Sequence, residues 1–292
     1  MSERRYDEEA LVAILLIDGY NLMYRSFTSL PRSIVGADKK PINGVYGLLT
    51  FLNLSIRQFG TDRVTFAFDT PGFSTFRHDL YPDYQGQRGP LGGEHADDFA
   101  RQTVILQEVA TGLGIPVVAR ERFEADDLIG SLAVALAAEG EHAIIVSTDR
   151  DLLQLIRPGI EMYSPSNPPL HARSEDDVRA RLGVSPAGVT TFKALAGDAS
   201  DNIPGVPGIG AKSASSLVAQ YGTLENMYEH LHEMPPRLST KLSEGRAEAF
   251  LFRQVVTVLT DLEVPVDEVR EARAKMAPDD TSRQILNRFG FG

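Results

Sequence analysis

The sequence predicts an α/β fold, in which a mainly parallel sheet is flanked by helices and followed by a helical region. Over the first two-thirds of the 292 residues, short apolar runs alternate with longer segments that have the apolar spacing of helices. Three of these runs end at, or just before, an aspartate. Strands separated by helices of this length are typical of a parallel sheet covered on both faces.

The first expected elements lie before residue 70. Residues 13–17 (AILLI) form an apolar strand that ends at Asp18. Residues 43–60 carry apolar side chains at helical spacing, and residues 64–68 form a second strand that ends at Asp69. Both aspartates therefore follow a strand directly.

The next elements repeat this alternation. A helix over 97–114 is stopped by glycine, and a strand over 115–118 follows it. An Ala/Leu-rich helix over 125–139 precedes an apolar strand over 143–147, with Asp149 two residues later. The carboxyl ends of strands carry the site in open α/β sheets, so these strand-end aspartates are candidates for function.

After about residue 183 the sequence is helical and shows no convincing strand pattern. The expected helices cover 186–196, 213–221, 224–232 and 246–259. We therefore expect two regions, a sheet domain over 1–183 and a helical region over 184–292.

The stretch from residue 70 to 96 breaks the alternation. It holds three prolines and five glycines, with basic and aromatic residues at Arg77, His78, Tyr81, Tyr84 and Arg88. Loops of this length are usually functional or disordered. Basic residues interleaved with aromatics suit a single-stranded nucleic acid, and a solvated insertion is the alternative.

Composition excludes several classes of protein. Hydrophobic residues make up 42% and charged residues 24%, as in soluble globular proteins, and no apolar run is long enough for a membrane span. Acidic residues precede the first apolar run, which argues against a secretory signal. The absence of cysteine excludes disulfides and thiolate zinc sites and fits the cytoplasm. The net charge of −11 argues against a protein that coats nucleic acid, unless the acids gather around cations.

Nine acidic residues are candidates for such a gathering. They are Asp18 and Asp69 at strand ends, Glu124, Asp126 and Asp127 in E-A-D-D, Asp149 and Asp151 in T-D-R-D, and Asp198 and Asp201 in G-D-A-S-D-N. Each one alone could be a helix cap or a turn residue, and the E-A-D-D acids lie where the dipole of a helix favours them. Carboxylates that converge repel one another unless divalent cations compensate them. Two ions of Mg²⁺ or Mn²⁺ could then support phosphodiester hydrolysis.

The segment from Ile203 to Ser213, I-P-G-V-P-G-I-G-A-K-S, looks like a phosphate loop. It fails the Walker A and dinucleotide patterns, because Ala211 intervenes before Lys212 and no strand precedes it. A glycine-rich turn between two helices remains. Its backbone N–H groups could hold a DNA phosphate, and a plain tight turn is the alternative.

These segments together resemble the 5′ nuclease family. In order they are D-G-Y-N-L-x-Y-R-x-F (Asp18–Phe27), F-D (Phe68–Asp69), F-R-H (Phe76–His78), E-A-D-D, T-D-R-D and G-D-x-S-D-N-I-P-G-V-x-G-I-G-x-K. The likeness is greatest to the 5′ nuclease domain of bacterial DNA polymerase I, with phage 5′ exonucleases and flap endonucleases as relatives. It implies a PIN-like catalytic domain, an arch near residues 70–100 and a helix-three-turn-helix DNA-binding motif at about 186–222.

The resemblance also implies roles for residues. One metal would be held by Asp18, Asp69, Glu124, Asp126, Asp127 and Asp149, and a second by Asp149, Asp151, Asp198 and Asp201. Asp18 and Asp69 would act in catalysis with Arg77 and Arg88, which would orient the phosphate. The DNA contacts would be Arg25, Tyr84 stacked on an unpaired base, Gly208, Gly210 and Lys212, with K⁺ as a candidate ion at the turn.

One position departs from the family pattern. The family usually has Y-K-x-x-R in the arch, whereas this sequence has Tyr84, Gln85 and Arg88 in that frame. A neutral amide donates a hydrogen bond but brings no charge to the phosphate.

The expected function is metal-dependent cleavage of DNA with a 5′ flap, a 5′ overhang or a nick, by a free-standing monomer at the nucleoid. RNA primer ends are a further candidate substrate. The rivals are a non-catalytic DNA binder, which the loss of Lys at position 85 would favour, and a PIN-type ribonuclease, which needs no helix-three-turn-helix motif. A phosphatase is a weaker rival, because Asp18-Gly19-Tyr20 lacks the second aspartate of a D-x-D nucleophile motif.

Overall fold

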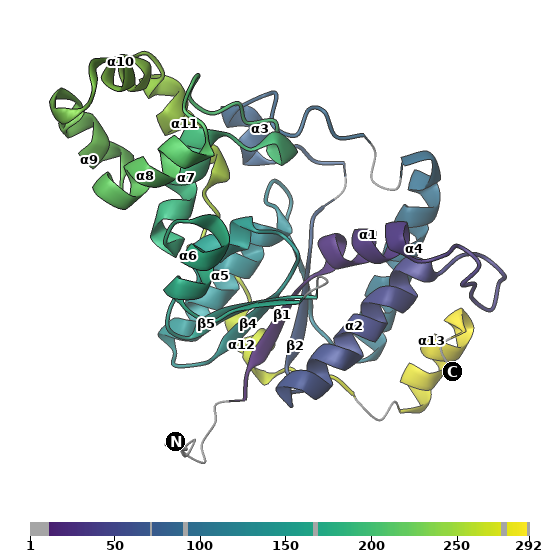
Figure 1. Ribbon diagram of the computed structural model, residues 1–292. Helices are drawn as coiled ribbons and strands as arrows, with labels where there is room; N and C mark the ends of the chain where they lie inside the picture. Colours follow the sequence, from purple (N-terminus) through teal and green to yellow (C-terminus); the bar gives the residue numbers. More distant parts are fainter. Residues whose placement is uncertain (1–11, 71, 90–92, 166–168, 276–278, 291–292) are drawn as a thin grey trace.

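The computed structural model describes residues 12–70, 72–89, 93–165, 169–275 and 279–290. Its centre is a six-stranded sheet in the order β3-β2-β1-β4-β5-β6 (Figure 1). The strands are β1 (Ile14–Asp18), β2 (Val64–Phe68), β3 (Val117–Ala119), β4 (Ala143–Val146), β5 (Ile160–Ser164) and β6 (Leu170–Ala172). All neighbours pair in parallel except β5 and β6, so the predicted mainly parallel sheet is confirmed.

The order of the strands places a crevice beside β1. The chain builds β1, β2 and β3 toward one edge and then returns to place β4 on the other side of β1. Residues of β1, β2 and β4 are all buried, as expected for strands covered on both faces. Asp18 is the last residue of β1 and Asp69 follows β2, so both lie at the carboxyl edge near the point where the strand order reverses.

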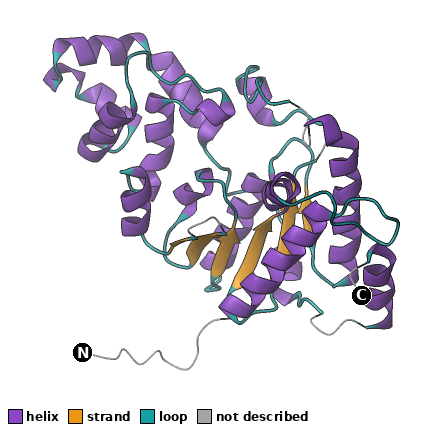
Figure 2. Ribbon diagram, turned by 45° about the vertical axis from the view of Figure 1, so that its right-hand side comes forward, coloured by secondary structure: helices purple, strands orange, loops and turns teal. Residues whose placement is uncertain are grey.

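Helices cover both faces of the sheet (Figure 2). Leu15, Ile17 and Phe66 pack in one cluster with residues of α1 (Gly19–Ser29), α2 (Asn43–Phe59) and α4 (Ala96–Gly112). The helix α13 (Asp280–Phe289) packs against α4. Leu16 and Ile145 face the opposite cluster, which contains α5 (Ala125–Ala138), α6 (Glu175–Leu182) and α12 (Val266–Glu271).

The region after residue 183 is helical, as predicted. It contains α7 (Val189–Ala196), α8 (Ala211–Tyr221), α9 (Leu224–Glu229), α10 (Pro236–Glu244) and α11 (Arg246–Val256). Helix α7 packs against α8 and α11, and α11 also contacts α3 (Phe76–Leu80) above the sheet (Figure 1). Single turns of 3-10 helix lie at Gly93–His95, Asp151–Leu155, Pro186–Gly188, Ala199–Asp201 and Leu231–Glu233.

Several elements were not predicted from the sequence. They are α1, α3, β5, β6, α6, α10, α12 and α13. Most of them are short or polar, so their apolar spacing is weak and tertiary contacts decide their structure. No helix within the described ranges has the length and apolar character needed to cross a bilayer.

Candidate metal centre

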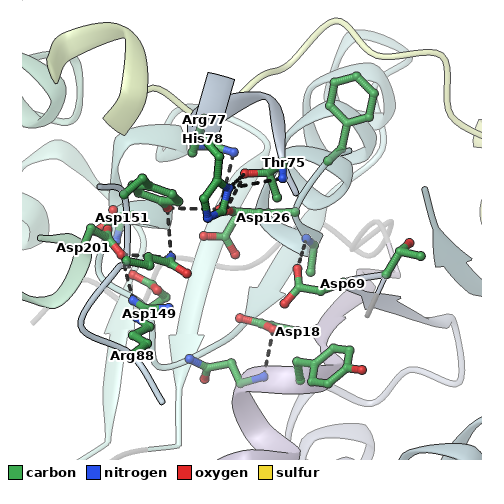
Figure 3. Close-up of a pocket in the computed structure, with 18 of the residues that line it drawn as sticks. Asp18, Asp69, Thr75, Arg77, His78, Arg88, Asp126, Asp149, Asp151 and Asp201 are labelled. Atoms are coloured by element: carbon green, nitrogen blue, oxygen red, sulfur yellow. Dashed lines mark hydrogen bonds and ion pairs between the residues drawn. The ribbon is translucent and has the colours of Figure 1, made fainter. Parts of the chain in front are cut away.

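A cavity of about 740 Å³ opens at the carboxyl edge of the sheet, beneath the segment that carries α3. Seven of the nine predicted acids line it: Asp18, Asp69, Glu124, Asp126, Asp149, Asp151 and Asp201. Figure 3 shows the carboxylates of Asp18, Asp69 and Asp126 turned toward the same space. The strand-end aspartates therefore meet, as their positions along parallel strands predict.

Backbone and hydroxyl donors fix the two strand-end carboxylates. Asp18 caps α1 by accepting a hydrogen bond from the Asn21 N–H at 3.1 Å, and its second oxygen accepts from the Ser147 hydroxyl at 2.6 Å. Asp69 accepts from the Ala125 N–H at 2.7 Å, at the start of α5. These contacts tie the end of β1 to the end of β4 and the end of β2 to the start of α5.

The amino terminus of α5 contributes two further acids. Glu124 accepts hydrogen bonds from the Thr75 hydroxyl at 3.4 Å and the Tyr84 hydroxyl at 3.2 Å. Asp126 is partly buried and lines the cavity. No salt bridge within the described residues involves Asp126.

A second group of acids lies beside the first. Oxygen atoms of Asp151, Asp198 and Asp201 lie within 4.8 Å of one another. The Lys193 ammonium of α7 lies between Asp151 and Asp198 and donates to both. Asp149 connects the two groups, because its N–H donates to the Ser147 hydroxyl at 3.0 Å and its Oδ1 accepts from the Asp151 N–H at 2.9 Å.

Burial and the charges of neighbouring carboxylates raise the pKa values of the acids in the first group. Burial raises the pKa of Asp18 to about 7. The hydrogen bond from Ser147 opposes this shift, and the charge of Asp69 adds to it. Burial raises the pKa of Glu124 to about 7 against the opposing charge of Arg77. Burial and then the charge of Asp149 raise the pKa of Asp126 well above its usual range. Clustered oxygen ligands that repel one another fit divalent cations that prefer oxygen.

Asp127 does not line the cavity, so its role as a metal ligand stays a prediction, and its contacts point to a structural role instead. Its side chain is fully buried, and it forms a bidentate pair with Arg77 at 2.7 and 2.8 Å. Its oxygens also accept from the backbone N–H groups of Glu124 and Leu259. With both oxygens engaged inside the protein, Asp127 has a structural role, as a buried charge needs a partner.

Arg77 is bound by other protein groups, and its role in orienting the phosphate stays a prediction. Its side chain is 3% exposed, and beyond Asp127 it donates to the carbonyls of Val255 and Thr257. The guanidinium therefore joins α3 to α5 and to the end of α11. Arg77 lines the cavity, but the hydrogen bonds of its guanidinium go to protein groups.

Tyr84 does not offer a stacking surface in this structure. The residue is 4% exposed, its hydroxyl donates to Glu124, and its ring meets His78 edge to face. Stacking on an unpaired base needs an open ring face, so the stacking role of Tyr84 stays a prediction that would require the ring to become exposed. The buried ring instead packs in a cluster with Phe252 and Val255.

The arch segment is attached to the loop that carries Asp201. Gln85 and Arg88 both donate to Asp201 Oδ1, at 3.0 and 2.7 Å. Gln87 donates to the carbonyls of Ala199 and Ser200. Arg88 remains 48% exposed and lines the cavity, so it can reach a ligand that enters there.

The predicted DNA-contact residues outside the cavity lie on two elements. Gly208, Gly210 and Lys212 are exposed, and Gly210 caps the start of α8. Gly208 has a φ of +78°, and a Cβ there would lie 2.6 Å from Lys241 Nζ, which donates to the Gly208 carbonyl. Arg25 is partly buried on α1.

Three residues at the site were missed from the sequence. Ser147 and Asn21 hold the ends of β1 and β4, because the Asn21 side chain accepts from both the Thr148 N–H and its hydroxyl. Lys193 pairs with two of the acids. Ser147 and Asn21 could have been found from the sequence, because each lies within two or three residues of a strand-end aspartate. No sequence pattern marks Lys193 as a site residue.

Metal removal is expected to destabilise the protein more as the pH rises. Carboxyls with a raised folded-state pKa contribute stability that is fully present below pH 4 and lost as the pH rises through about 7. Divalent cations would offset that loss. We expect the gap in Tm between Mg²⁺ and chelator to widen from pH 5 to pH 8, reaching about 5 °C or more.

Thermal melts of the wild type, Asp126→Asn and Asp176→Asn check this expectation. Asp126→Asn removes one charge from the cavity and should narrow the gap, whereas Asp176 is an exposed residue of α6 and its replacement should leave the gap unchanged. Equal Tm values with Mg²⁺ and chelator at pH 8 would contradict the assignment of a cation to these acids.

Two family models match consecutive parts of the chain. The model described as "5'-3' exonuclease, N-terminal resolvase-like domain" matches residues 13–183, and the one described as "5'-3' exonuclease, C-terminal SAM fold" matches residues 184–280. Together they cover most of the described sheet and helices.

Curated relatives include bacterial DNA polymerases. The chain is 35% identical over 279 residues to "DNA polymerase I, thermostable" of Thermus thermophilus, covering 96% of this chain and 32% of that protein. It is 34% identical to "DNA polymerase I" of Pseudomonas aeruginosa, covering 94% of this chain and 29% of that protein. The chain thus spans about a third of the length of the curated relatives it matches.

Solved structures share the fold at low identity. A structure of the T5 5′-exonuclease with bound zinc matches with a TM-score of 0.69 at 21% identity, covering 94% of this chain and 98% of that one. The catalytic core of Rad2 in complex with DNA substrate matches with a TM-score of 0.59 at 16% identity, covering 99% and 91%.

Proposed function

This chain belongs to the 5′-3′ exonuclease family, and from that premise we propose that it hydrolyses DNA phosphodiesters near the junction of a 5′ single strand and a duplex. The observation that carries the proposal is the cavity in which seven carboxylates from β1, β2, β4, α5 and the loop before α8 converge. The structure described for the T5 enzyme contains divalent metal and that of Rad2 contains DNA, which supports the same chemistry here.

The residues of the cavity would hold Mg²⁺ or Mn²⁺. Asp18, Asp69, Glu124, Asp126 and Asp149 offer oxygens for one ion, and Asp149, Asp151, Asp198 and Asp201 for another. When bound, two such ions activate the attacking water and stabilise the leaving oxygen of an in-line displacement. The hydrogen bonds from Asn21, Ser147 and Ala125 preorganise the carboxylates, so that little rearrangement is needed during the reaction. The products would carry 5′-phosphate and 3′-hydroxyl ends.

Arg88 is the residue proposed to orient the scissile phosphate. It is the guanidinium on the arch that remains half exposed and faces the cavity, whereas Arg77 is held inside the protein. A guanidinium binds phosphate through two parallel hydrogen bonds, which fixes the direction of attack. Gln85 would add a hydrogen bond without charge, so the electrostatic contribution rests on Arg88.

The exposed turn before α8 is proposed to hold the duplex. Backbone N–H groups at the start of α8 and the Lys212 ammonium favour a phosphate, and a K⁺ ion at the turn would add positive charge. Arg25 on α1 would contact the same DNA closer to the cavity. These contacts read the backbone and not the sequence, as structure-specific cleavage requires.

Replacing Lys212 with alanine is expected to weaken duplex binding without changing the metal site. We expect the affinity for duplex DNA to be about three- to tenfold lower at 0.1 M salt, because one phosphate contact is lost. For the same reason, the slope of log affinity against log salt concentration should become smaller in magnitude by about one. Fluorescence anisotropy against salt concentration measures both quantities. Lys275→Ala removes an ammonium paired with a surface carboxylate and serves as the control; an equal loss in both variants would contradict a specific role of Lys212.

A substrate panel tests the proposed function. A labelled 5′ flap, a 3′ flap and an RNA 5′ flap of the same sequence are incubated with Mg²⁺ or Mn²⁺. Cleavage of the DNA 5′ flap near the junction, with a 5′-phosphate on the product, supports flap or primer removal by an enzyme working at the nucleoid. Faster cleavage of the RNA flap would favour a ribonuclease, and tight binding of flap DNA without cleavage would favour a non-catalytic binder.

A further inference from the structure

The second group of acids is neutralised by cations and donors of the chain itself. The Lys193 ammonium contacts both Asp151 and Asp198, and its side chain is 11% exposed. On the other side, Gln85 and Arg88 donate to Asp201 Oδ1 at 3.0 and 2.7 Å. Each acid of the group therefore has an internal partner.

The first group contrasts with this arrangement. Asp18, Asp69 and Asp126 line the same cavity, and no ammonium or guanidinium within the described ranges forms a salt bridge with them. Asp18 accepts from the Asn21 N–H and the Ser147 hydroxyl, and Asp69 accepts from the Ala125 N–H, all of them neutral donors. In the first group only Glu124, among the described residues, has a cationic contact, with Arg77 at 3.4 Å, and that guanidinium is held by Asp127; in the second group Lys193 contacts both Asp151 and Asp198.

We propose that Lys193 is an internal competitor for the second divalent ion, which binds only after the ammonium has left Asp151 and Asp198. This inference rests on the proposed two-ion function and specifies the order in which the ions bind. Lys193 lies on α7, five residues before Asp198, so rotation of its flexible side chain is enough to bring the ammonium to the acids or to take it away. A compact ammonium with three donors can satisfy two carboxylates at once and can leave without moving the helix.

Lys193 stabilises the second group of acids in the protein without bound ions. Three carboxylates within 4.8 Å of one another would repel without a cation. Lys193 stabilises them while the second ion is absent. An ion that binds the second group must therefore displace Lys193 from Asp151 and Asp198. In DNA-free protein, the second ion should therefore bind with lower affinity than the first. A phosphodiester in the cavity would give the displaced ammonium another anionic partner, so DNA and the second ion would favour each other.

The test is a Mn²⁺ titration of the full DNA-free chain, with free Mn²⁺ counted by electron paramagnetic resonance. The wild type should bind one ion tightly and a second at least about tenfold more weakly. Lys193→Gln should tighten the second ion by about tenfold, since the competing ammonium is gone. Lys193→Arg, which keeps a charge at the position, should stay close to the wild type. Lys275→Gln removes a surface ammonium paired with a carboxylate and should change neither constant.

A second measurement uses the wild type and does not depend on how a variant folds. Acylation of lysines by a water-soluble reagent, read by mass spectrometry, should label Lys193 weakly in chelator and several-fold more strongly at saturating Mn²⁺, whereas Lys275 should be labelled equally in both. Unchanged labelling of Lys193, or a second Mn²⁺ constant in Lys193→Gln that equals or is weaker than that of the wild type, would overturn the proposal. Cleavage by the wild type is scored separately, so these outcomes can reject the role of Lys193 while the nuclease function stands.

Discussion

Replacing Asp149 with asparagine is expected to abolish cleavage and to leave the protein folded. Its carboxylate lines the cavity and accepts from the Asp151 N–H, while its own N–H donates to the Ser147 hydroxyl that also binds Asp18, so it lies between the two groups of acids. An amide offers one neutral oxygen in place of a charged carboxylate, which weakens the coordination of both ions. We expect the rate of flap cleavage to fall at least about a thousandfold.

Stability distinguishes this loss from unfolding. Removing one of several converging charges relieves repulsion, so the Tm of Asp149→Asn in chelator should equal or exceed that of the wild type. Asp176→Asn, an exposed position on α6, should retain full cleavage. If Asp149→Asn cleaves at a near-normal rate, the carboxylate does not serve the ions and the two-ion assignment is lost.

Breaking the pair of Arg77 and Asp127 is expected to have the largest effect on stability. Both side chains are buried, and the pair joins α3, α5 and the residues after α11 through six hydrogen bonds and a contact with Glu124. Asp127→Asn leaves the buried Arg77 charge without its partner. Removing one member of a buried ion pair costs about 3–5 kcal/mol in the free energy of unfolding.

Urea unfolding of Asp127→Asn, Arg77→Met and the double variant Arg77→Met/Asp127→Leu measures this pair. The double variant should recover much of the loss, because no charge is left buried alone. Asp127→Asn should bind the same number of Mn²⁺ ions as the wild type wherever it is folded. A variant with unchanged stability that binds fewer ions would restore Asp127 as a metal ligand and contradict the structural role.

The E-A-D-D segment shows how far the sequence could predict the site. Its acids are adjacent, and a pattern of residue types cannot tell which of them faces the cavity. On a helix, neighbouring residues point about 100° apart, so when Asp126 faces the cavity, Asp127 points into the protein. The deciding contact is Arg77, fifty positions away in the sequence, and only the fold brings it to Asp127.

The strand ends were more predictable than the arch. Asp18 and Asp69 followed from the rule that parallel strands present their carboxyl ends at one edge. The sequence allowed two environments for Tyr84 in the arch: an exposed ring that stacks on a base, or a buried ring whose hydroxyl donates to an acid. The structure has the buried ring, with the hydroxyl donating to Glu124. Lys193 carried no signal, since a single lysine on a helix is usually solvated and its partners come from other segments.

The central claim is that the carboxylates of the cavity hold two divalent cations, and anomalous scattering from crystals soaked in a high concentration of Mn²⁺ tests it most directly. We expect one peak among Asp18, Asp69, Asp126 and Asp149, and a second about 4 Å away toward Asp151 and Asp201. Lys193 should have left Asp151 where the second peak is present, and Asp127 should touch neither ion. Absence of any peak in the cavity, or a peak bound by Asp127, would show that these carboxylates do not hold the ions as proposed.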